Sequence, residues 1–242
     1  MKISTTSYTI PMAGLTCPVR LAVVADFHNG EDAAVLCALE KAGPQAVLLP
    51  GDFLHKVGAV ERGFRLLSGC AARYPTFCSL GNHETKSGVA DLPARVADTG
   101  AVLLDNDTAR IGGLTLGGLT TGYALGMKQG RMRPTPPPNR AFLAEFARMC
   151  GPRVLLCHHP EYYASYIRET DIPLTLSGHA HGGQWQIFGR GVFAPGQGFF
   201  PRYTAGLYEG RLLVSRGLGG GPALIPRLGN PREILIVDLL PA

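Results

Sequence analysis

A repeated pattern of strand, polar tip and helix limits the possible folds of this 242-residue chain more than any other feature. In each of three repeats, a short apolar run ends in polar residues and is followed by a segment with the spacing of an amphipathic helix. Glu31 and Asp32 stand at the start of the first helical segment, where acidic side chains interact favourably with the helix dipole. Alternating strands and helices indicate an α/β architecture, in which ligands bind beyond the carboxyl ends of the strands. The three pairs of run and helical segment are 19–25 with 32–39, 46–49 with 60–72, and 77–80 with 89–97.

The second half of the chain has shorter predicted strands and one long loop. Residues 122–139 contain four prolines and are predicted to form a surface loop, within which the role of the proline-rich part 131–138 stays open. Residues 140–150 are predicted to form a helix. Because strands return at the end of the chain, we expect two sheets that face each other with helices outside. The later strands are predicted at 109–111, 114–119, 154–157, 172–176, 212–215 and 234–239.

The composition predicts one domain over residues 1–242. Hydrophobic residues make up 45% of the chain and charged residues 17%, which is enough apolar material for a core and too few charges for disorder. A linker rich in proline, serine or charge does not divide the sequence. The six cysteines form no CxxC pair and fall mostly in apolar segments, so we expect buried, reduced thiols.

The net charge and the N-terminal segment limit the classes of partner that the protein is expected to bind and its expected location. The net charge of +5 comes mainly from arginine, whose planar fork suits phosphate and carboxylate, so an anionic substrate is favoured. A dense basic run is absent, and the sequence therefore gives no strong signal for nucleic-acid binding. Pro11, Gly14 and Pro18 interrupt residues 1–21, which predicts neither a secretory signal nor a membrane span. We expect a soluble, cytoplasmic protein with at most peripheral contact to a membrane.

Potential metal ligands stand at the ends of five predicted strands. His179 and His181 follow the run 172–176, lie one residue apart between glycines, and can bind two metal ions or two faces of one ion. Each polar tip alone has an ordinary explanation as a helix cap or a turn, whereas five tips in a fixed order are a specific signal. In order, the tips read DxH at 26–28, GD at 51–52, GNHE at 81–84, His158, and GHAHGG at 178–183.

This ordered set resembles the calcineurin-like metallophosphoesterase superfamily. Three tail motifs, GLY at 206–208, VSRGLG at 214–219 and RLGNP at 227–231, resemble its bacterial YkuE/YaeI-type phosphodiesterase branch. The resemblance covers residues 19–240. It implies a four-layer αββα sandwich of two mixed β-sheets flanked by helices, and a binuclear metal-dependent phosphohydrolase of the phosphodiesterase or pyrophosphatase type.

Two divalent ions about 3.5–4 Å apart need a shared anionic ligand, and Asp52 is the best candidate for that bridge. Mixed nitrogen and oxygen ligands suit Mn²⁺ first, with Fe²⁺, Zn²⁺ or Mg²⁺ as alternatives. The nucleophile implied by the resemblance is a hydroxide that bridges the ions, and His83 is the candidate catalytic residue that stabilises or protonates the leaving oxygen. By resemblance, Asp26, His28 and His181 complete one metal site, and Asn82, His158 and His179 complete the other.

Other residues receive weaker or negative assignments. Arg202 and Arg216 are weak candidates for binding substrate phosphate, and Arg216 could equally hold a strand end in place. We exclude His159 as a ligand because neighbours along a strand point to opposite sides, and we exclude His55 because a lone histidine is more often structural. Proteins of the YkuE/YaeI-type branch often have an acidic residue at the position of His55. Its absence leaves open which side chain would interact with the metal-binding residues from outside the ligand set.

Two other functions stay open. A non-catalytic scaffold or binding module on the same fold would be expected to lose metal-ligand histidines, which this chain keeps. A nuclease would be consistent with the net positive charge, but the sequence has no pattern of aromatic and basic residues that would predict a groove for single-stranded nucleic acid. The natural substrate, a phosphorylated small molecule or a nucleotide- or lipid-linked phosphate, and the oligomeric state are not determined by the sequence.

Overall fold

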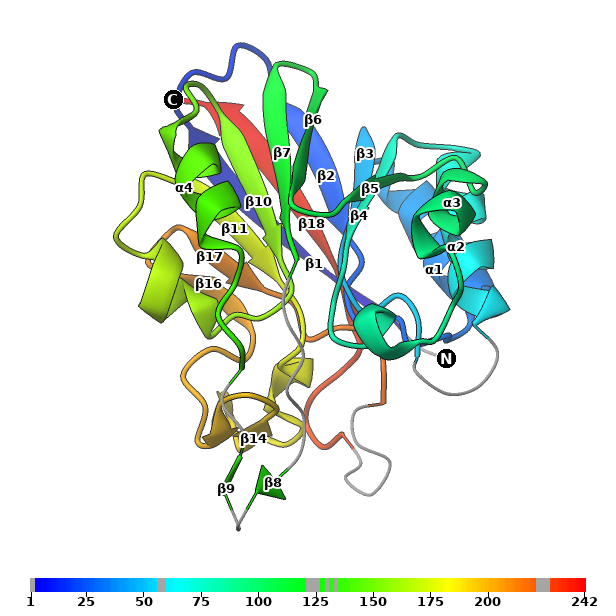
Figure 1. Ribbon diagram of the computed structural model, residues 1–242, viewed down its shortest axis with the longest axis vertical. Helices are drawn as coiled ribbons and strands as arrows, with labels where there is room; N and C mark the ends of the chain where they lie inside the picture. The colour runs from blue at the N-terminus through cyan, green and yellow to red at the C-terminus, as the bar shows by residue number, and fades with distance from the viewer. Residues whose placement is uncertain (1–2, 56–59, 121–126, 129–130, 133–134, 221–226) are drawn as a thin grey trace.

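Two six-stranded mixed sheets face each other at the centre of the molecule (Figure 1). The computed structural model describes residues 3–55, 60–120, 127–128, 131–132, 135–220 and 227–242. The first sheet has the order β1-β18-β2-β3-β4-β5, with β1 Ser4–Met12, β18 Glu233–Pro241, β2 Val19–Val23, β3 Ala46–Pro50, β4 Thr76–Ser79 and β5 Val102–Leu104. The second has the order β16-β17-β11-β10-β7-β6, with β16 Gly206–Tyr208, β17 Leu212–Val214, β11 Leu174–Ser177, β10 Arg153–Cys157, β7 Leu114–Leu119 and β6 Asp107–Ile111.

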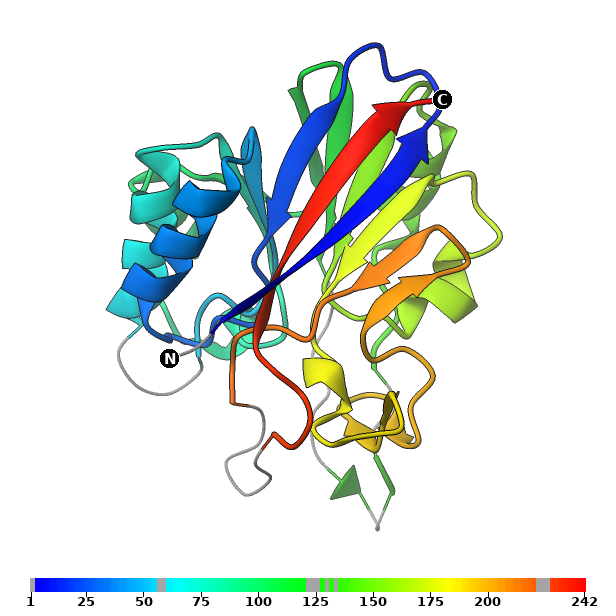
Figure 2. The same cartoon turned by 180° about the vertical axis from the view of Figure 1, so that it is seen from behind.

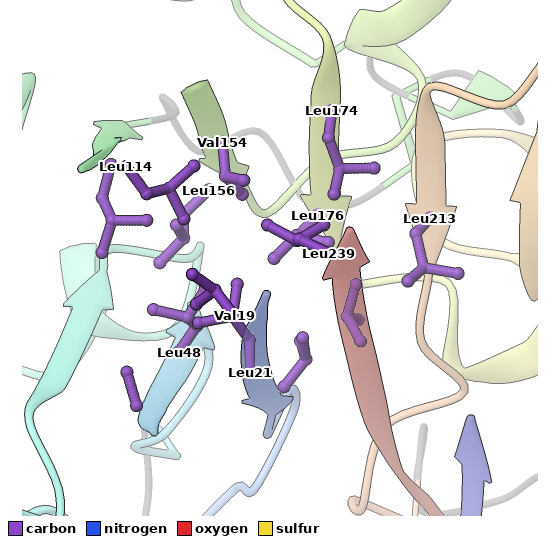
Figure 3. Packing of buried hydrophobic residues seen from close by; sticks show 14 of the residues in the cluster. Val19, Leu21, Leu48, Leu114, Val154, Leu156, Leu174, Leu176, Leu213 and Leu239 are labelled. Atoms are coloured by element: carbon purple, nitrogen blue, oxygen red, sulfur yellow. The ribbon is translucent and has the colours of Figure 1, made fainter. Parts of the chain in front are cut away.

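Alternation along the strands divides the apolar side chains between two faces of each sheet. In β2, Leu21 packs in the core between the sheets, whereas its neighbour Ala22 packs on the outer face. In β10, Leu156 faces the central core and Leu155 faces outward. Figure 3 shows leucine and valine side chains from both sheets converging in the space between them.

Helices cover both outer faces. The helices α1 Asp32–Ala42, α2 Glu61–Ala71 and α3 Leu92–Ala97 pack on the first sheet (Figures 1 and 2). The helix α4 Arg140–Arg148 and the π-helical turn Tyr163–Ile167 pack on the second. These layers confirm the predicted αββα sandwich of two mixed sheets.

Short elements complete the part of the chain that the structure describes. Two 3-10 turns, Glu84–Lys86 and His181–Gly183, belong to the loops beyond the strands. Three small antiparallel hairpins pair β8 Met127–Lys128 with β9 Arg131–Met132, β12 Gln186–Ile187 with β13 Arg190–Gly191, and β14 Phe193–Ala194 with β15 Gly198–Phe199. Much of the predicted loop 122–139 lies outside the described residues. None of the described helices is long and apolar enough to cross a bilayer.

The strand β1 was not predicted from the sequence. It runs parallel to β18 along its whole length, from Ser4 opposite Glu233 to Met12 opposite Pro241. Most of its side chains are at least partly exposed, so the segment lacks the apolar pattern of a buried strand. Its position at the sheet edge also accommodates Pro11, which cannot donate a ladder hydrogen bond.

The expectation of buried thiols was correct for only half of the cysteines. All six are free, and Cys70, Cys78 and Cys157 are buried. Cys17, Cys37 and Cys150 are exposed, because they lie in a turn, on the outer side of α1 and just beyond α4.

Candidate metal centre

The seven predicted ligands lie in loops that follow the carboxyl ends of strands in both sheets. Asp26 and His28 follow β2, and Asp52 follows β3. The remaining four, Asn82 after β4, His158 after β10, and His179 with His181 after β11, complete the set. Four of them therefore come from the first sheet and three from the second, so the site forms only where the two sheets meet.

One ligand group consists of Asp26, His28 and His181. Nε2 of His28 lies 3.3 Å from Nε2 of His181 and 4.0 Å from Oδ1 of Asp26. One donor atom from each of the three residues lies within 4.8 Å of the other two. Donor atoms about 2.1 Å from one ion are roughly 3.0–3.4 Å apart in octahedral or tetrahedral geometry, so this group fits one metal ion after small adjustments.

The second ligand group contains Asp52, His158 and His179, whose donor atoms also lie within 4.8 Å of one another. Nε2 of His158 lies 3.1 Å from Oδ2 of Asp52 and 3.2 Å from Oδ1 of Asn82. These separations match those of neighbouring ligands on one ion. The amide of Asn82 is thus placed where the sequence predicts a neutral oxygen ligand.

Asp52 lies between the two groups. Its Oδ2 atom is 3.1 Å from Nε2 of His158 and 3.7 Å from Nε2 of His28. Its Oδ1 atom accepts a hydrogen bond of 2.8 Å from the backbone N–H of His83. This bond orients the carboxylate so that one oxygen faces donors from both sheets, as a bridging ligand requires.

Hydrogen bonds to and from the backbone fix how the predicted ligands present their donor atoms. Nδ1 of His158 lies 2.9 Å from the carbonyl oxygen of Pro50, and a carbonyl can only accept, so Nδ1 carries a proton. The backbone N–H of His179 donates to both carboxylate oxygens of Asp26 at 3.0 Å. The ring of His158 is therefore oriented so that a metal ion would replace the proton on Nε2, the atom that faces Asp52 and Asn82.

Glu84 holds two of the ligand loops together, a role that the sequence reasoning missed. Its buried carboxylate accepts hydrogen bonds from the backbone N–H groups of Asp52 at 2.8 Å, Leu54 at 2.7 Å and Gly81 at 2.8 Å. Burial and the charge of Asp52 raise the pKa of Glu84 to about 8, while the bonds from Leu54 and Gly81 lower it. The backbone donors thus oppose the rise in pKa, because they stabilise the ionised form. The only sequence signal was its place at the end of the GNHE motif.

The backbone of the ligands is strained. Five of the seven have positive φ angles in the left-handed region, namely Asp26 at 52°, His28 at 49°, Asp52 at 54°, His179 at 66° and His181 at 47°. This region costs a non-glycine residue on the order of 1 kcal/mol and is enriched at functional sites.

Glycines allow the ligand loops to approach closely. A Cβ atom at Gly81 would lie 2.3 Å from Oδ1 of Asp52, and one at Gly217 would lie 2.4 Å from Oδ2 of Asp26. Both separations are shorter than real Cβ contacts, so no larger residue fits at either position without displacing a carboxylate.

Burial keeps two ligand imidazoles neutral. The pKa values of His28 and His181 are lowered to about 3, mainly by desolvation, and nearby positive groups add to the effect at His181. His158 and Asp52 behave as an ion pair. Desolvation alone would lower the pKa of His158, but the charge of Asp52 and their hydrogen bond outweigh it and raise that pKa to about 10.

The residues predicted to act on substrate differ in how close they lie to the metal centre and in what they contact. Nε2 of His83 lies 3.9 Å from Oδ2 of Asp52, beside the predicted ligands. Arg216 forms a 3.4 Å ion pair with the buried Glu233, and Arg202 forms one of 3.4 Å with Glu209 at the surface. Both arginines thus already have acidic partners, and their assignment to substrate stays a prediction.

The two excluded histidines are closer to the site than the sequence reasoning assumed. The ring of His55 lies 4.7 Å from that of His83, and the buried ring of His159 lies 4.2 Å from that of His179. The alternation argument fails at His159 because β10 ends at Cys157, so His158 and His159 are past the strand. One donor atom each of His159, Glu161 and His179 also lie within 4.8 Å of one another.

Comparison with known proteins agrees with this geometry. The profile of the calcineurin-like phosphoesterase family matches residues 19–183, which include all seven predicted ligands. An uncharacterized metallophosphoesterase of Campylobacter jejuni is 27% identical over 246 residues, covering 96% of this chain and 62% of that protein. Phosphodiesterase YaeI of Escherichia coli is 28% identical over 240 residues, covering 92% of this chain and 83% of that protein.

Among solved structures, TT1561 of Thermus thermophilus aligns with a TM-score of 0.42 and 15% identity, covering 66% of this chain and 81% of that chain. This chain spans less than two thirds of the Campylobacter protein's length. The family profile covers more than half of this chain and includes the whole ligand set. The chain therefore belongs to the calcineurin-like phosphoesterase family.

Proposed function

We propose that this chain is a binuclear metal-dependent phosphohydrolase of the phosphodiesterase or pyrophosphatase type, folded as one domain over residues 1–242. The observation that carries the proposal is the position of Asp52, whose Oδ2 atom lies within 3.7 Å of imidazole nitrogens from two separate ligand groups. A carboxylate that only stabilised the fold would not need to face imidazole nitrogens from both sheets. Binuclear hydrolases need one anion in that position.

The two ligand groups have distinct roles in this proposal. Bound divalent ions would supply a hydroxide nucleophile near neutral pH and would polarise the phosphoryl oxygens. The chain contributes nitrogen and oxygen donors, which favour Mn²⁺, with Fe²⁺, Zn²⁺ or Mg²⁺ as alternatives. Asp26, His28 and His181 would hold one ion, Asn82, His158 and His179 would hold the other, and Asp52 would bind both.

His83 is the proposed catalytic residue. Desolvation lowers the pKa of its half-buried imidazole, so the neutral ring can donate an N–H hydrogen bond to the leaving oxygen. Its backbone N–H is already fixed by Asp52, which keeps the side chain at the edge of the ligand set. Removal of the imidazole should therefore slow the reaction while leaving the metal ions bound.

We further propose a cytoplasmic enzyme with peripheral membrane contact that acts on a nucleotide- or lipid-linked phosphate. The support is a set of exposed apolar side chains, called here the rim patch, on the segments that follow His181. Phe188 is 100% exposed and Phe200 is 82% exposed, and the exposed Arg190 lies on the same segment. Exposed apolar side chains with neighbouring basic residues suit an anionic lipid surface. The rim patch consists of Trp185, Ile187, Phe188, Phe199, Phe200 and Leu228. The apolar pair Leu224 and Ile225 lies outside the described residues.

The test compares wild type with Asp52→Ala and His179→Ala in hydrolysis of bis(p-nitrophenyl) phosphate after loading with Mn²⁺. We expect a loss of roughly 100-fold or more, since even outer partners of metal ligands cost 10- to 100-fold. Glu169→Gln, at an exposed position away from the ligand loops, is the control. Unchanged turnover in either ligand variant would end the proposal. Fewer than one equivalent of bound metal in the wild type would instead favour a scaffold.

A further inference from the structure

A guanidinium group that was assigned no role from the sequence lies directly beside the ligand set. Nη2 of Arg227 lies 3.4 Å from Nδ1 of His181. Its Nε atom donates to the carbonyl oxygen of Gly219 at 2.8 Å, and Nη2 donates to that of Arg216 at 2.6 Å. The backbone of Gly219 in turn packs on the imidazole of His28, where a Cβ atom would lie 2.3 Å from Cδ2. Arg227 is thus oriented by the two loop segments that line the His28 and His181 side of the site.

Arg227 forms no direct ion pair with an acidic residue in the part of the chain that the structure describes. Within the described ranges, no carboxylate oxygen lies within 4.0 Å of its guanidinium nitrogens, and its buried Nη1 atom has no hydrogen-bond partner. Glu233 is already engaged, since its carboxylate accepts from the backbone N–H and Nη1 of Arg216 and from the hydroxyl of Thr6. A half-buried cation with an unused, buried donor atom is costly unless an anion binds it.

The contact with His181 does not satisfy this charge. Nε2 of His181 faces Nε2 of His28 at 3.3 Å, so Nε2 is the atom offered to a metal ion. The other nitrogen, Nδ1, faces Nη2 of Arg227 and can accept at most one hydrogen bond from it, and a neutral imidazole supplies no negative charge. The guanidinium therefore lies beside the ligand set with its charge uncompensated by His181.

Arg211 shows what a structural arginine looks like in the same fold. Each of its three guanidinium nitrogens donates a hydrogen bond to a backbone carbonyl oxygen, and the acceptors are Arg168, Thr170 and Ile172. Arg211 precedes β17, whereas the metal ligands follow the strands, so it lies at the opposite edge of the sheet. Arg227 differs in two respects, an unused nitrogen and a position beside the metal ligands, and both point to an anionic ligand.

We propose that Arg227 binds a non-bridging oxygen of the phosphoryl group that the metal centre attacks. This inference rests on the proposed phosphohydrolase function and adds to it the residue that recognises the substrate's phosphate. The planar fork of arginine suits phosphate oxygens, and its two carbonyl bonds hold it in place before substrate arrives. The specificity implied is for an anionic phosphoryl group, whatever the alcohol or phosphate that leaves.

The experiment measures binding of inorganic phosphate, which stands in for the phosphate monoester that the proposed reaction releases, by titration calorimetry to protein loaded with Mn²⁺ and dialysed free of excess metal. Wild type is compared with Arg227→Gln, Arg227→Lys and the matched control Arg211→Gln. Metal content is determined for each sample, and kcat and KM are measured with bis(p-nitrophenyl) phosphate. We expect Arg227→Gln to weaken phosphate binding about 10- to 100-fold and to raise KM with unchanged metal content, because a charge-assisted bond is lost.

The conservative variant and the control define the outcome. Arg227→Lys should recover part of the phosphate affinity because the charge remains, and Arg211→Gln should bind phosphate as wild type does. Wild-type phosphate affinity in Arg227→Gln would overturn the inference, and so would a loss of metal from that variant, which would make Arg227 a positioning residue for His181. Failure of the proposed function is separate, because it is seen in the wild type alone as bound metal without hydrolysis.

Discussion

The Nδ1 atom of His158, which follows a strand of the second sheet, lies 2.9 Å from the carbonyl oxygen of Pro50 at the end of a strand in the first sheet. This bond crosses between the sheets two residues before Asp52. It holds the ring of His158 through the Nδ1 proton and brings its Nε2 atom to 3.1 Å from Asp52. The packing of the two sheets and the geometry of the metal centre are thus coupled through a single imidazole.

His158→Gln should remove one of the two metal ions. The variant loses the nitrogen that lies closest to Asp52 and Asn82, whereas Asp26, His28 and His181 remain in place. We expect metal analysis after Mn²⁺ loading to give about one equivalent where the wild type gives about two. His159→Gln is the matched control, since it alters the adjacent buried imidazole that is predicted not to be a ligand. Equal metal loss in both variants would contradict the sequence prediction that His158 is a metal ligand and His159 is not.

Glu84→Gln should loosen the loops that carry Asp52 and Asn82. An amide can turn only one oxygen toward the three backbone N–H groups, and its own NH₂ group then faces a donor. We expect a loss of roughly 1–3 kcal/mol in the free energy of unfolding, the usual cost of a buried unsatisfied donor. Denaturant unfolding of the metal-free protein measures it, with the exposed Glu169→Gln as control. Equal midpoints for the two variants would contradict the role given to Glu84.

The imidazoles of His28 and His181 should lower the stability of the metal-free protein as the pH falls from 7.5 to 5. His28 and His181 have folded-state pKa values of about 3 against about 6.5 for an unfolded histidine. Between these values the unfolded chain binds more protons, so stability rises with pH across this window and is lost on acidification. Each of the two imidazoles should lower the free energy of unfolding by about 2 kcal/mol at pH 5.

Thermal unfolding in the presence of a chelator at both pH values tests this dependence. In the double variant His28→Gln/His181→Gln, the difference between pH 7.5 and pH 5 should be much smaller. His158 acts in the opposite direction, because its raised pKa of about 10 gives stability that is complete below pH 6.5 and lost as pH rises through 10. A pH dependence as steep in the double variant as in wild type would refute the assignment to these two imidazoles.

The rim patch should bind anionic membranes weakly. Phe188→Ser/Phe200→Ser should lower the affinity for phosphatidylglycerol vesicles about 10-fold, because two exposed aromatic side chains can no longer bury apolar surface. Co-sedimentation at low and physiological salt measures the bound fraction. Val102→Ser/Leu240→Ser removes two exposed apolar side chains elsewhere and should bind as wild type does. Hydrolysis of a soluble substrate should be unchanged in both, and equal vesicle binding would remove the membrane proposal.

Local patterns in the sequence determined the fold class and the set of candidate ligands. Apolar runs of strand length fixed β2, β3, β4, β10 and β11, because burial on both faces demands such runs. The polar residues after those runs could be read as ligands because strand ends in an α/β fold share one edge. The edge strand β1 could not be found in this way, since its pairing with β18 joins residues more than two hundred positions apart.

Only the tertiary structure decided how these residues act together. Asp52 faces both ligand groups because two sheets, whose strands come from separate segments of the chain, pack with the ligand-bearing ends of their strands adjacent. Glu84 and Arg227 gained their roles from backbone groups of other loops, which no local pattern encodes. Side-chain chemistry is written in the sequence, whereas the distances that make it a site depend on which loops the core brings together.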